Sequence, residues 1–153
     1  MTELKEGDIA PDFRGVIENG REIQLSDYKG KKLVLYFYPK DNTPGCTAQA
    51  CNLTENQSAL KKAGFEILGV SADNEKKHQN FIDKYDIGFS LIADTDMELI
   101  KSYQVWGPKK FMGREYDGIH RTTFVINEEG TIERVFTKVK TKEHANQILE
   151  SYK

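Results

Sequence analysis

Two cysteines, Cys46 and Cys51, are the side chains in this sequence whose type and spacing best suit covalent chemistry. The segment 35–48 begins as an apolar and aromatic strand, passes through a turn and then opens a helix with Cys46 in its first turn. Unpaired N–H groups and the positive end of the helix dipole favour a thiolate there. The sequence therefore predicts a reactive thiol at Cys46. The alternative is a buried structural cysteine at a helix start.

Three other residues could bind a ligand beside a thiolate at position 46 or stabilise its charge. Gly45 lets the backbone approach a ligand closely, and the Thr43 hydroxyl can donate or accept a hydrogen bond. Arg121 begins a strand of threonine and apolar residues, where a charge is costly without a partner. A guanidinium near Cys46 would favour the thiolate and stabilise negative charge in a transition state. The alternative is an arginine in solvent on an edge strand.

The spacing of the two cysteines restricts how they can react with each other. In a regular helix, Cα atoms five residues apart are about 8.6 Å from each other, whereas a disulfide needs them within about 7 Å. Cys46 and Cys51 can therefore bond only if the first helical turns unwind. In that case a peroxide would oxidise Cys46 to a sulfenic acid, Cys51 would condense with it, and a thiol reductant would reset the pair.

Other thiol chemistries fit the sequence less well. A thioredoxin-type dithiol site needs Cys-x-x-Cys, whereas four residues separate these cysteines. A cysteine phosphatase needs an arginine six positions after its cysteine, where this chain has Asn52. The histidines at positions 78, 120 and 144 do not follow the spacing of a metal site. A noncatalytic binding domain is the general alternative.

The run Pro39-Lys-Asp-Asn-Thr-Pro-Gly-Cys46 resembles the peroxiredoxin pattern of a proline, three residues, a threonine, two residues and a cysteine. Cys51 stands where the bacterioferritin comigratory protein (peroxiredoxin Q) subgroup of atypical two-cysteine peroxiredoxins carries its resolving cysteine. The resemblance extends through the segment 105–124 and covers nearly the full length. It implies a thiol-dependent peroxidase with a thioredoxin-like fold.

Position by position, the resemblance implies a role for each of five residues. Cys46 would be the peroxidatic nucleophile and Cys51 the resolving thiol, joined after oxidation by an intramolecular disulfide. Thr43 would hydrogen-bond the peroxide, and Pro39 would shield the sulfur from water. Arg121 would stabilise the thiolate and the developing negative charge. Substrate would contact Thr43, Gly45, Cys46 and Arg121.

The resemblance also sets expectations for partners. Gln49 stands where the family often has Glu or Gln, and it would support Arg121. The substrate would be hydrogen peroxide or an organic hydroperoxide, and the reductant thioredoxin, with glutaredoxin as the alternative. No metal and no organic cofactor are expected. The protein would be a monomer, with a dimer as the alternative. A thiol–disulfide oxidoreductase or a redox sensor on the same scaffold is the alternative function.

The periodicity of the chain predicts an α/β fold with a mixed central sheet flanked by helices and preceded by an N-terminal β-hairpin. Strands are expected at 13–17, 22–25, 33–38, 65–70, 89–92, 121–126 and 131–136. Helices are expected at 46–63, around 78–85 with Ser71 or Asp73 as its cap, after 94–96, and from about Thr141. The segment 105–118, with its glycines and Pro108, is expected to be a long surface loop.

The composition places limits on the partners. The chain has 153 residues, which suits a single domain over residues 1–153. Twenty-two basic residues against 24 acidic ones give a formal charge of −2, which does not favour nucleic acid or an anionic membrane. Lys109 and Lys110 are expected to be solvated. The polar N-terminus does not resemble a secretory signal, so a cytoplasmic location is expected.

Overall fold

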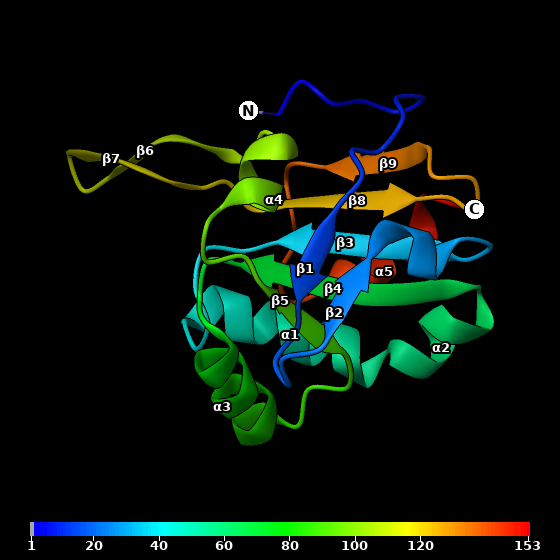
Figure 1. Ribbon diagram of the computed structural model, residues 1–153, viewed down its shortest axis with the longest axis horizontal. Coiled ribbons are helices and arrows are strands. Elements are labelled where there is room, and N and C mark those ends of the chain that lie inside the picture. The colour runs from blue at the N-terminus through cyan, green and yellow to red at the C-terminus, as the bar shows by residue number, and fades with distance from the viewer. Residues whose placement is uncertain (1) are drawn as a thin grey trace.

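The computed structural model describes residues 2–153 and has a five-stranded mixed sheet at its centre (Figure 1). The central strand β3 is parallel to β4, which is parallel to β5; on the other side β3 is antiparallel to β8, which is antiparallel to β9. From edge to edge, the strands are β5 (Ser90–Ala93), β4 (Phe65–Ser71), β3 (Lys32–Phe37), β8 (Thr122–Ile126) and β9 (Ile132–Phe136). The expected mixed central sheet is confirmed.

Strand β3 is buried on both faces, as its continuous apolar run predicts. Because successive side chains of a strand point to opposite faces, it contributes to two separate cores. Leu33, Leu35 and Phe37 belong to one core, and Val34 and Tyr36 belong to the other. The strand that leads to Cys46 is therefore fixed from both sides.

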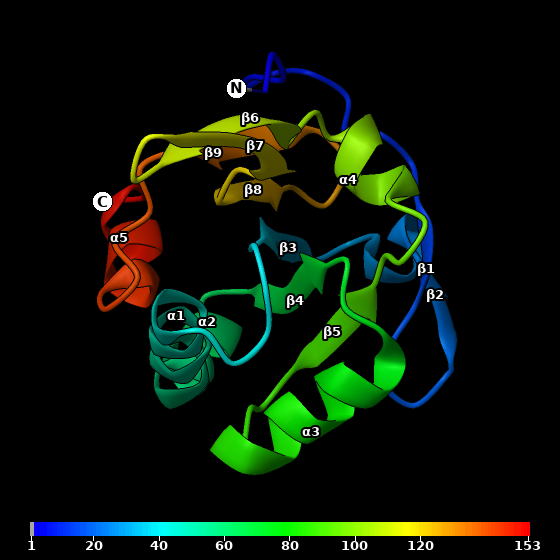
Figure 2. The same cartoon turned by 90° about the vertical axis from the view of Figure 1, so that its left-hand side faces the viewer.

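The elements on the two faces of the sheet differ. Figure 2 shows α1 (Pro44–Glu55) and α5 (His144–Glu150) on one side, and β1 (Arg14–Val16), β2 (Glu22–Gln24) and α4 (Glu98–Ser102) on the other. Strands β1 and β2 form the expected N-terminal hairpin, with Gly20 in its turn at φ 84°. The hairpin is anchored to the sheet edge by an isolated bridge between Ile17 and Ile92.

The helix expected at 46–63 is two helices in the structure. Helix α1 begins at Pro44, a residue whose fixed φ suits the first helical position, and ends at Glu55. Asn56 interrupts the helix: its side-chain amide donates to the carbonyl of Asn52 at 2.8 Å, and its backbone departs from helical geometry. Helix α2 (Gln57–Lys62) then follows, and Gly64 ends it at φ 92°.

The remaining helices occur where periodicity predicts them, with shifted starts. Helix α3 (Glu75–Tyr85) is capped by Asn74, whose side chain accepts from the Lys77 N–H at 2.9 Å, so the expectation of Ser71 or Asp73 as the cap was wrong. Ser71 belongs to β4. The last helix, α5, begins three residues later than expected, at His144.

The segment 105–118 is not the long loop that the sequence suggests. It forms an antiparallel hairpin of β6 (Trp106–Phe111) and β7 (Arg114–Ile119), which projects from the body of the molecule at the left of Figure 1. Most of its side chains are exposed, including Phe111 at 65% and Met112 at 87%. A hairpin without a buried face lacks the apolar alternation by which strands are identified. Within the part of the chain that is described, no helix is long and apolar enough to cross a membrane.

Candidate active site

The register of the sheet brings Arg121 close to the turn that carries Cys46. Strand β3 ends at Phe37, and its partner β8 begins with Thr122, which pairs with Phe37. Because the two strands are antiparallel, the residue before β8 lies beside the residues that follow β3. The expected neighbourhood of Arg121 and Cys46 thus follows from strand pairing, although 75 positions separate them.

Arg121 joins two residues of α1. Its Nη2 donates to the Cys46 Sγ at 3.4 Å, and its Nη1 donates to the Gln49 Oε1 at 2.7 Å. Cys46 and Gln49 are three residues apart, so they lie on the same helix face. A permanent positive charge at this distance stabilises a thiolate relative to a thiol. The structure therefore provides Cys46 with the cationic partner that the sequence predicts.

Gly45 permits the approach of the guanidinium. A Cβ atom added at position 45 would lie 3.2 Å from the Arg121 Nη2 and 3.9 Å from its Cζ, which is closer than most Cβ contacts. The side chain that glycine lacks would therefore press on the arginine. This close approach is the structural reason for glycine at this position, since Gly45 does not have a positive φ.

The start of α1 supplies further polar groups. Thr43 precedes the helix in an extended conformation, and the Thr47 N–H donates to the Thr43 carbonyl at 2.8 Å. The N–H groups of Gly45 and Cys46 come before that first helical bond, so they point out of the helix end. The Thr43 hydroxyl donates to the Lys40 carbonyl at 2.9 Å, which leaves its lone pairs free to accept.

Cys46 is buried, with 1% of its surface exposed, while Pro39, Thr43, Gly45 and Arg121 are half-buried. Pro39 follows directly on Tyr38, whose N–H donates to the carbonyl of Val70 at 3.1 Å.

Cys51 lies farther along the same helix and is not bonded to Cys46; both are free thiols. Helix α1 is continuous over both positions, so the separation expected from helix geometry holds. Burial, and then the nearby Glu55 carboxylate, raise the pKa of the Cys51 thiol. The adjacent Asn52 ties this part of α1 to the start of α5, because its Nδ2 donates to the Lys142 carbonyl just before α5 and its Oδ1 accepts from the N–H of Ala145 in its first turn.

Tyr36 was missed from the sequence, whereas Gln49 was expected to support Arg121, and within residues 2–153 both carry an unpaired polar group. The Tyr36 hydroxyl and the Gln49 Nε2 are buried without a hydrogen-bond partner among the described residues. Burial, and then negative charge at Cys46, raise the pKa of Tyr36 well above its ordinary value. Tyr36 lies in a strand that reads as ordinary core, so no local signal marks its hydroxyl.

Lys109 was also missed, because it was expected to be solvated together with Lys110. Lys109 is half-buried, and its Nζ donates to the Ile119 carbonyl at 2.9 Å. Burial and the charge of Arg121 lower the pKa of Lys109, while negative charge at Cys46 opposes this. The hairpin β6–β7 therefore contributes a lysine whose pKa responds to the charges of Arg121 and Cys46, which could only be recognised once the hairpin was known.

The three histidines have protein partners. His120 Nε2 contacts the Pro108 carbonyl at 3.0 Å, and His144 contacts the Thr123 hydroxyl and the Gln147 side chain. His78, in α3, is fully buried against Asp41 and the carbonyl of Ile92. In residues 2–153, no three His, Cys, Asp or Glu side chains cluster as metal ligands would.

Comparison with known proteins gives a consistent result. The family model described as the AhpC/TSA family matches residues 7–135. The chain is 46% identical over 149 residues to the peroxiredoxin Bcp of Escherichia coli, covering 97% of this chain and 96% of the relative. It is 42% identical over 150 residues to the peroxiredoxin Bcp of Bacillus subtilis, covering 98% and 96% of the two chains.

The fold of the chain is also similar to those of solved peroxiredoxin structures. A cysteine-to-serine mutant of Xylella fastidiosa PrxQ superimposes with a TM-score of 0.92 at 31% identity, covering 99% of this chain and 97% of that one. A bacterioferritin comigratory protein of Xanthomonas campestris, studied for alkyl peroxide reduction, superimposes with a TM-score of 0.85 at 36% identity, covering 91% and 88%.

Proposed function

Because the chain belongs to the AhpC/TSA family and is a peroxiredoxin, we propose that Cys46 is its peroxidatic nucleophile and Cys51 its resolving thiol. The observation that carries this proposal is the position of the Cys46 Sγ at the start of α1, 3.4 Å from the Arg121 Nη2. A helix N-terminus and a guanidinium both favour the thiolate that must attack the peroxide.

In the first step the Cys46 thiolate attacks one oxygen of the hydroperoxide. A bond forms between sulfur and that oxygen, the O–O bond breaks, and the leaving alkoxide or hydroxide takes up a proton. Cys46 is thereby oxidised to a sulfenic acid. Arg121 and the N–H groups of Gly45 and Cys46 would stabilise the leaving oxygen. Since the Thr43 hydroxyl donates to Lys40, it would accept the O–H of the peroxide and so orient it.

In the second step the Cys51 thiol attacks the sulfenic sulfur, and water leaves as the disulfide forms. The helical geometry requires the first turns of α1 to unwind for this step. The contacts of Asn52 with Lys142 and Ala145 at the start of α5 support a mechanism in which Cys51 stays in place and Cys46 moves to it. A dithiol reductant would then restore both thiols by exchange.

We propose thioredoxin as that reductant, with glutaredoxin as the alternative, and hydrogen peroxide and organic hydroperoxides as substrates. The alkyl peroxide reduction studied in the Xanthomonas relative supports the wider substrate range. We further propose that residues 1–153 act as one domain, as a cytoplasmic monomer with a dimer as the alternative.

A coupled assay with peroxide, thioredoxin and thioredoxin reductase tests the proposal on the wild type, Cys46→Ser and Cys51→Ser. We expect peroxide-dependent turnover in the wild type and none in Cys46→Ser. In Cys51→Ser we expect a long-lived sulfenic acid that a dimedone-type reagent labels. Full activity of Cys46→Ser would refute the assignment of the nucleophile. Two titratable thiols in the wild type after one equivalent of peroxide would refute the disulfide.

A further inference from the structure

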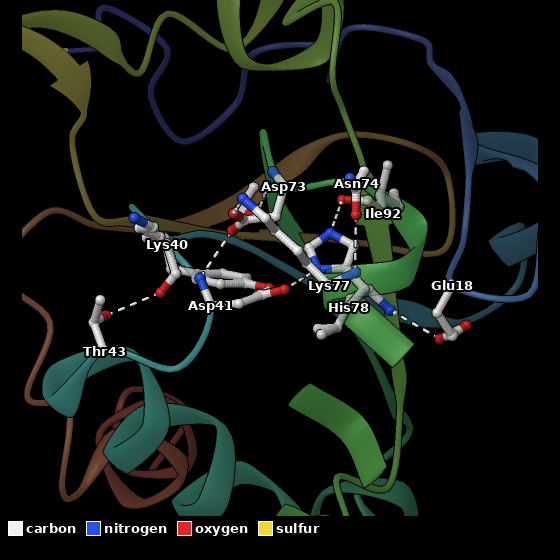
Figure 3. Close-up of polar contacts among 12 residues, drawn as sticks. Glu18, Lys40, Asp41, Thr43, Asp73, Asn74, Lys77, His78 and Ile92 are labelled. Carbon is white, nitrogen blue, oxygen red and sulfur yellow. Dashed lines mark hydrogen bonds and ion pairs between the residues drawn. The ribbon is translucent and has the colours of Figure 1, made fainter. Parts of the chain in front are cut away.

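The turn between β3 and α1 is held by a buried polar network centred on Asp41, which lies two residues before Thr43 and is 8% exposed (Figure 3). Its Oδ1 accepts from the Tyr38 hydroxyl at 2.5 Å, and its Oδ2 lies 2.6 Å from the Nδ1 of His78. His78, from α3, is fully buried, and its Nε2 lies 2.8 Å from the Ile92 carbonyl of β5. One carboxylate thus links the active-site turn to β3, α3 and β5.

The backbone of the turn between β3 and α1 is also held by hydrogen bonds from β4, α3 and the segment between them. The Asp41 N–H donates to the Asp73 Oδ2 at 2.8 Å, and that oxygen also accepts from the Ser71 hydroxyl at 2.8 Å. Asn42 has a φ of 62°, a conformation that is uncommon outside glycine, and its Oδ1 accepts from the Tyr85 hydroxyl at 3.0 Å. These contacts come from β4, α3 and the segment between them, so they do not depend on α1 being folded.

The hydrogen atoms of this network can be counted. Both ring nitrogens of His78 face oxygen atoms, the Asp41 carboxylate on one side and the Ile92 carbonyl on the other. A carbonyl oxygen can only accept, and so can an ionised carboxylate. A neutral imidazole has one N–H, so beside an ionised carboxylate it would leave one of these two short contacts without a hydrogen. With Asp41 ionised, the contacts are satisfied together when His78 carries two N–H groups and pairs as a cation with Asp41.

We propose that Asp41 and His78 form a buried ion pair that positions the active-site turn for peroxide reduction. The pair fixes the backbone of residues 40–42, and the Thr43 hydroxyl is directed by its bond to the Lys40 carbonyl in that backbone. It also fixes the point from which α1 begins, and it remains in place when the first turn of α1 unwinds. Asp41 and His78 are positioning residues; they do not touch the peroxide. The proposal rests on the assignment of Thr43 and Cys46 to the peroxidase site.

Kinetics of the first step test the positioning role. The second-order rate constant for peroxide oxidation of Cys46 is measured by stopped flow in Asp41→Asn, His78→Gln and the double variant. A displacement of about 1 Å can slow a reaction by roughly 100-fold, so we expect each single variant to be about 10- to 100-fold slower. Because the two residues act as one unit, the double variant should be no slower than the slower single variant.

Two controls accompany these variants. Asp83→Asn makes the same chemical change on the exposed face of α3, where the Asp83 carboxylate accepts a hydrogen bond from the Gln79 side chain, and it should keep the wild-type rate constant. Thermal unfolding of each variant identifies any that do not fold. Single variants that are folded and react within twofold of the wild type would overturn the proposal, as would losses that multiply in the double variant.

A second measurement uses the unmodified protein. Nitrogen-15 chemical shifts of the His78 ring at pH 7 report how many of its nitrogens carry a proton, and we expect both. A single protonated nitrogen would overturn the ion pair even if every variant failed to fold. The two proposals also fail in different ways. A wild type that does not react with peroxide refutes the peroxidase site, whereas a reactive wild type with unaffected variants refutes only the positioning role.

Discussion

The side-chain oxygen of Gln49 accepts a 2.7 Å hydrogen bond from the Nη1 of Arg121, one helical turn away from the sulfur that the other amino group of Arg121 contacts. The guanidinium is therefore oriented by the same helix that carries Cys46. When the first turns of that helix unwind, Arg121 loses both partners together. Both contacts of Arg121 therefore form only when the first turns of α1 are folded.

Replacement of Arg121 by methionine should slow oxidation of Cys46 by roughly 100- to 1,000-fold, because removal of one preorganised charge partner costs catalysis by about that factor. The measurement is the second-order rate constant with hydrogen peroxide under pseudo-first-order conditions. Arg121→Lys keeps the charge without the two-pronged geometry and should fall between the wild type and Arg121→Met. An unchanged rate in Arg121→Met would place the arginine outside the reaction.

Replacement of Gln49 by leucine should slow the oxidation of Cys46 without lowering the stability of the protein. Arg121 would lose its acceptor, so oxidation should become about tenfold slower, as the loss of about one hydrogen bond implies. The same change removes the buried Nε2 that has no partner in the described residues, so the thermal midpoint should be kept or raised. A lower midpoint with an unchanged rate constant would show that Gln49 acts on packing instead.

Replacement of Gly45 by alanine should displace the guanidinium, since the new Cβ would lie 3.2 Å from the Arg121 Nη2. The oxidation rate should fall several-fold, with little change in stability. In an Arg121→Met background the same substitution should have a much smaller effect, because the displaced group is absent. An equal loss in both backgrounds would mean that Gly45 acts through the helix backbone.

His144 should make the protein less stable as the pH falls. Burial lowers the pKa of His144 from 6.5 to about 4; the charge of Arg121 adds to this, and the hydrogen bond to Gln147 opposes it. Between those values the unfolded chain binds a proton that the folded protein does not. The contribution of neutral His144 to the free energy of unfolding is therefore fully present above pH 6.5. It is lost as the pH falls towards 4, by up to about 3 kcal/mol.

The comparison variant for this effect is His144→Gln, which cannot titrate and can still bond Thr123 and Gln147. Unfolding free energies of both proteins are measured by denaturant titration between pH 4 and 7. Carboxylates contribute equally to both, so their effect cancels in the difference. The free energy of unfolding of the wild type, minus that of His144→Gln, should decrease as the pH falls from 7 to 4. A constant difference would contradict the lowered pKa.

The residues around Cys46 show where sequence reasoning succeeds. The apolar run before position 38 could only be a covered strand, and the turn that follows places Cys46 in the first helical turn, as observed. The neighbourhood of Arg121 and Cys46 was expected from resemblance, and the register of β3 with β8 is the physical cause. The catalytic roles of these residues stay predictions until they are measured.

The features that sequence reasoning missed depend on contacts between distant segments. Lys109 reads as a surface lysine because the hairpin that carries it has no buried face. His78 reads as a helix-face residue because its partners, Asp41 and Ile92, belong to other elements. Asn56 ends α1 through a side-chain bond to the helix backbone that competes with helix continuation. None of these is encoded in local periodicity.

The fastening of α1 through Asn52 has a consequence for the catalytic cycle as a whole. Five extended residues can reach roughly 17 Å, about twice the roughly 8.6 Å between the two Cα atoms in a regular helix, so the length of chain does not limit their meeting. With Asn52 fixed to the start of α5, the proposed cycle would unfold only the stretch from 44 to about 50. That stretch refolds onto a waiting scaffold through neighbouring contacts alone, and such local rearrangements are fast. In the proposed cycle the enzyme would therefore unfold and refold its reactive centre at every turnover while the rest of the molecule stays as it is.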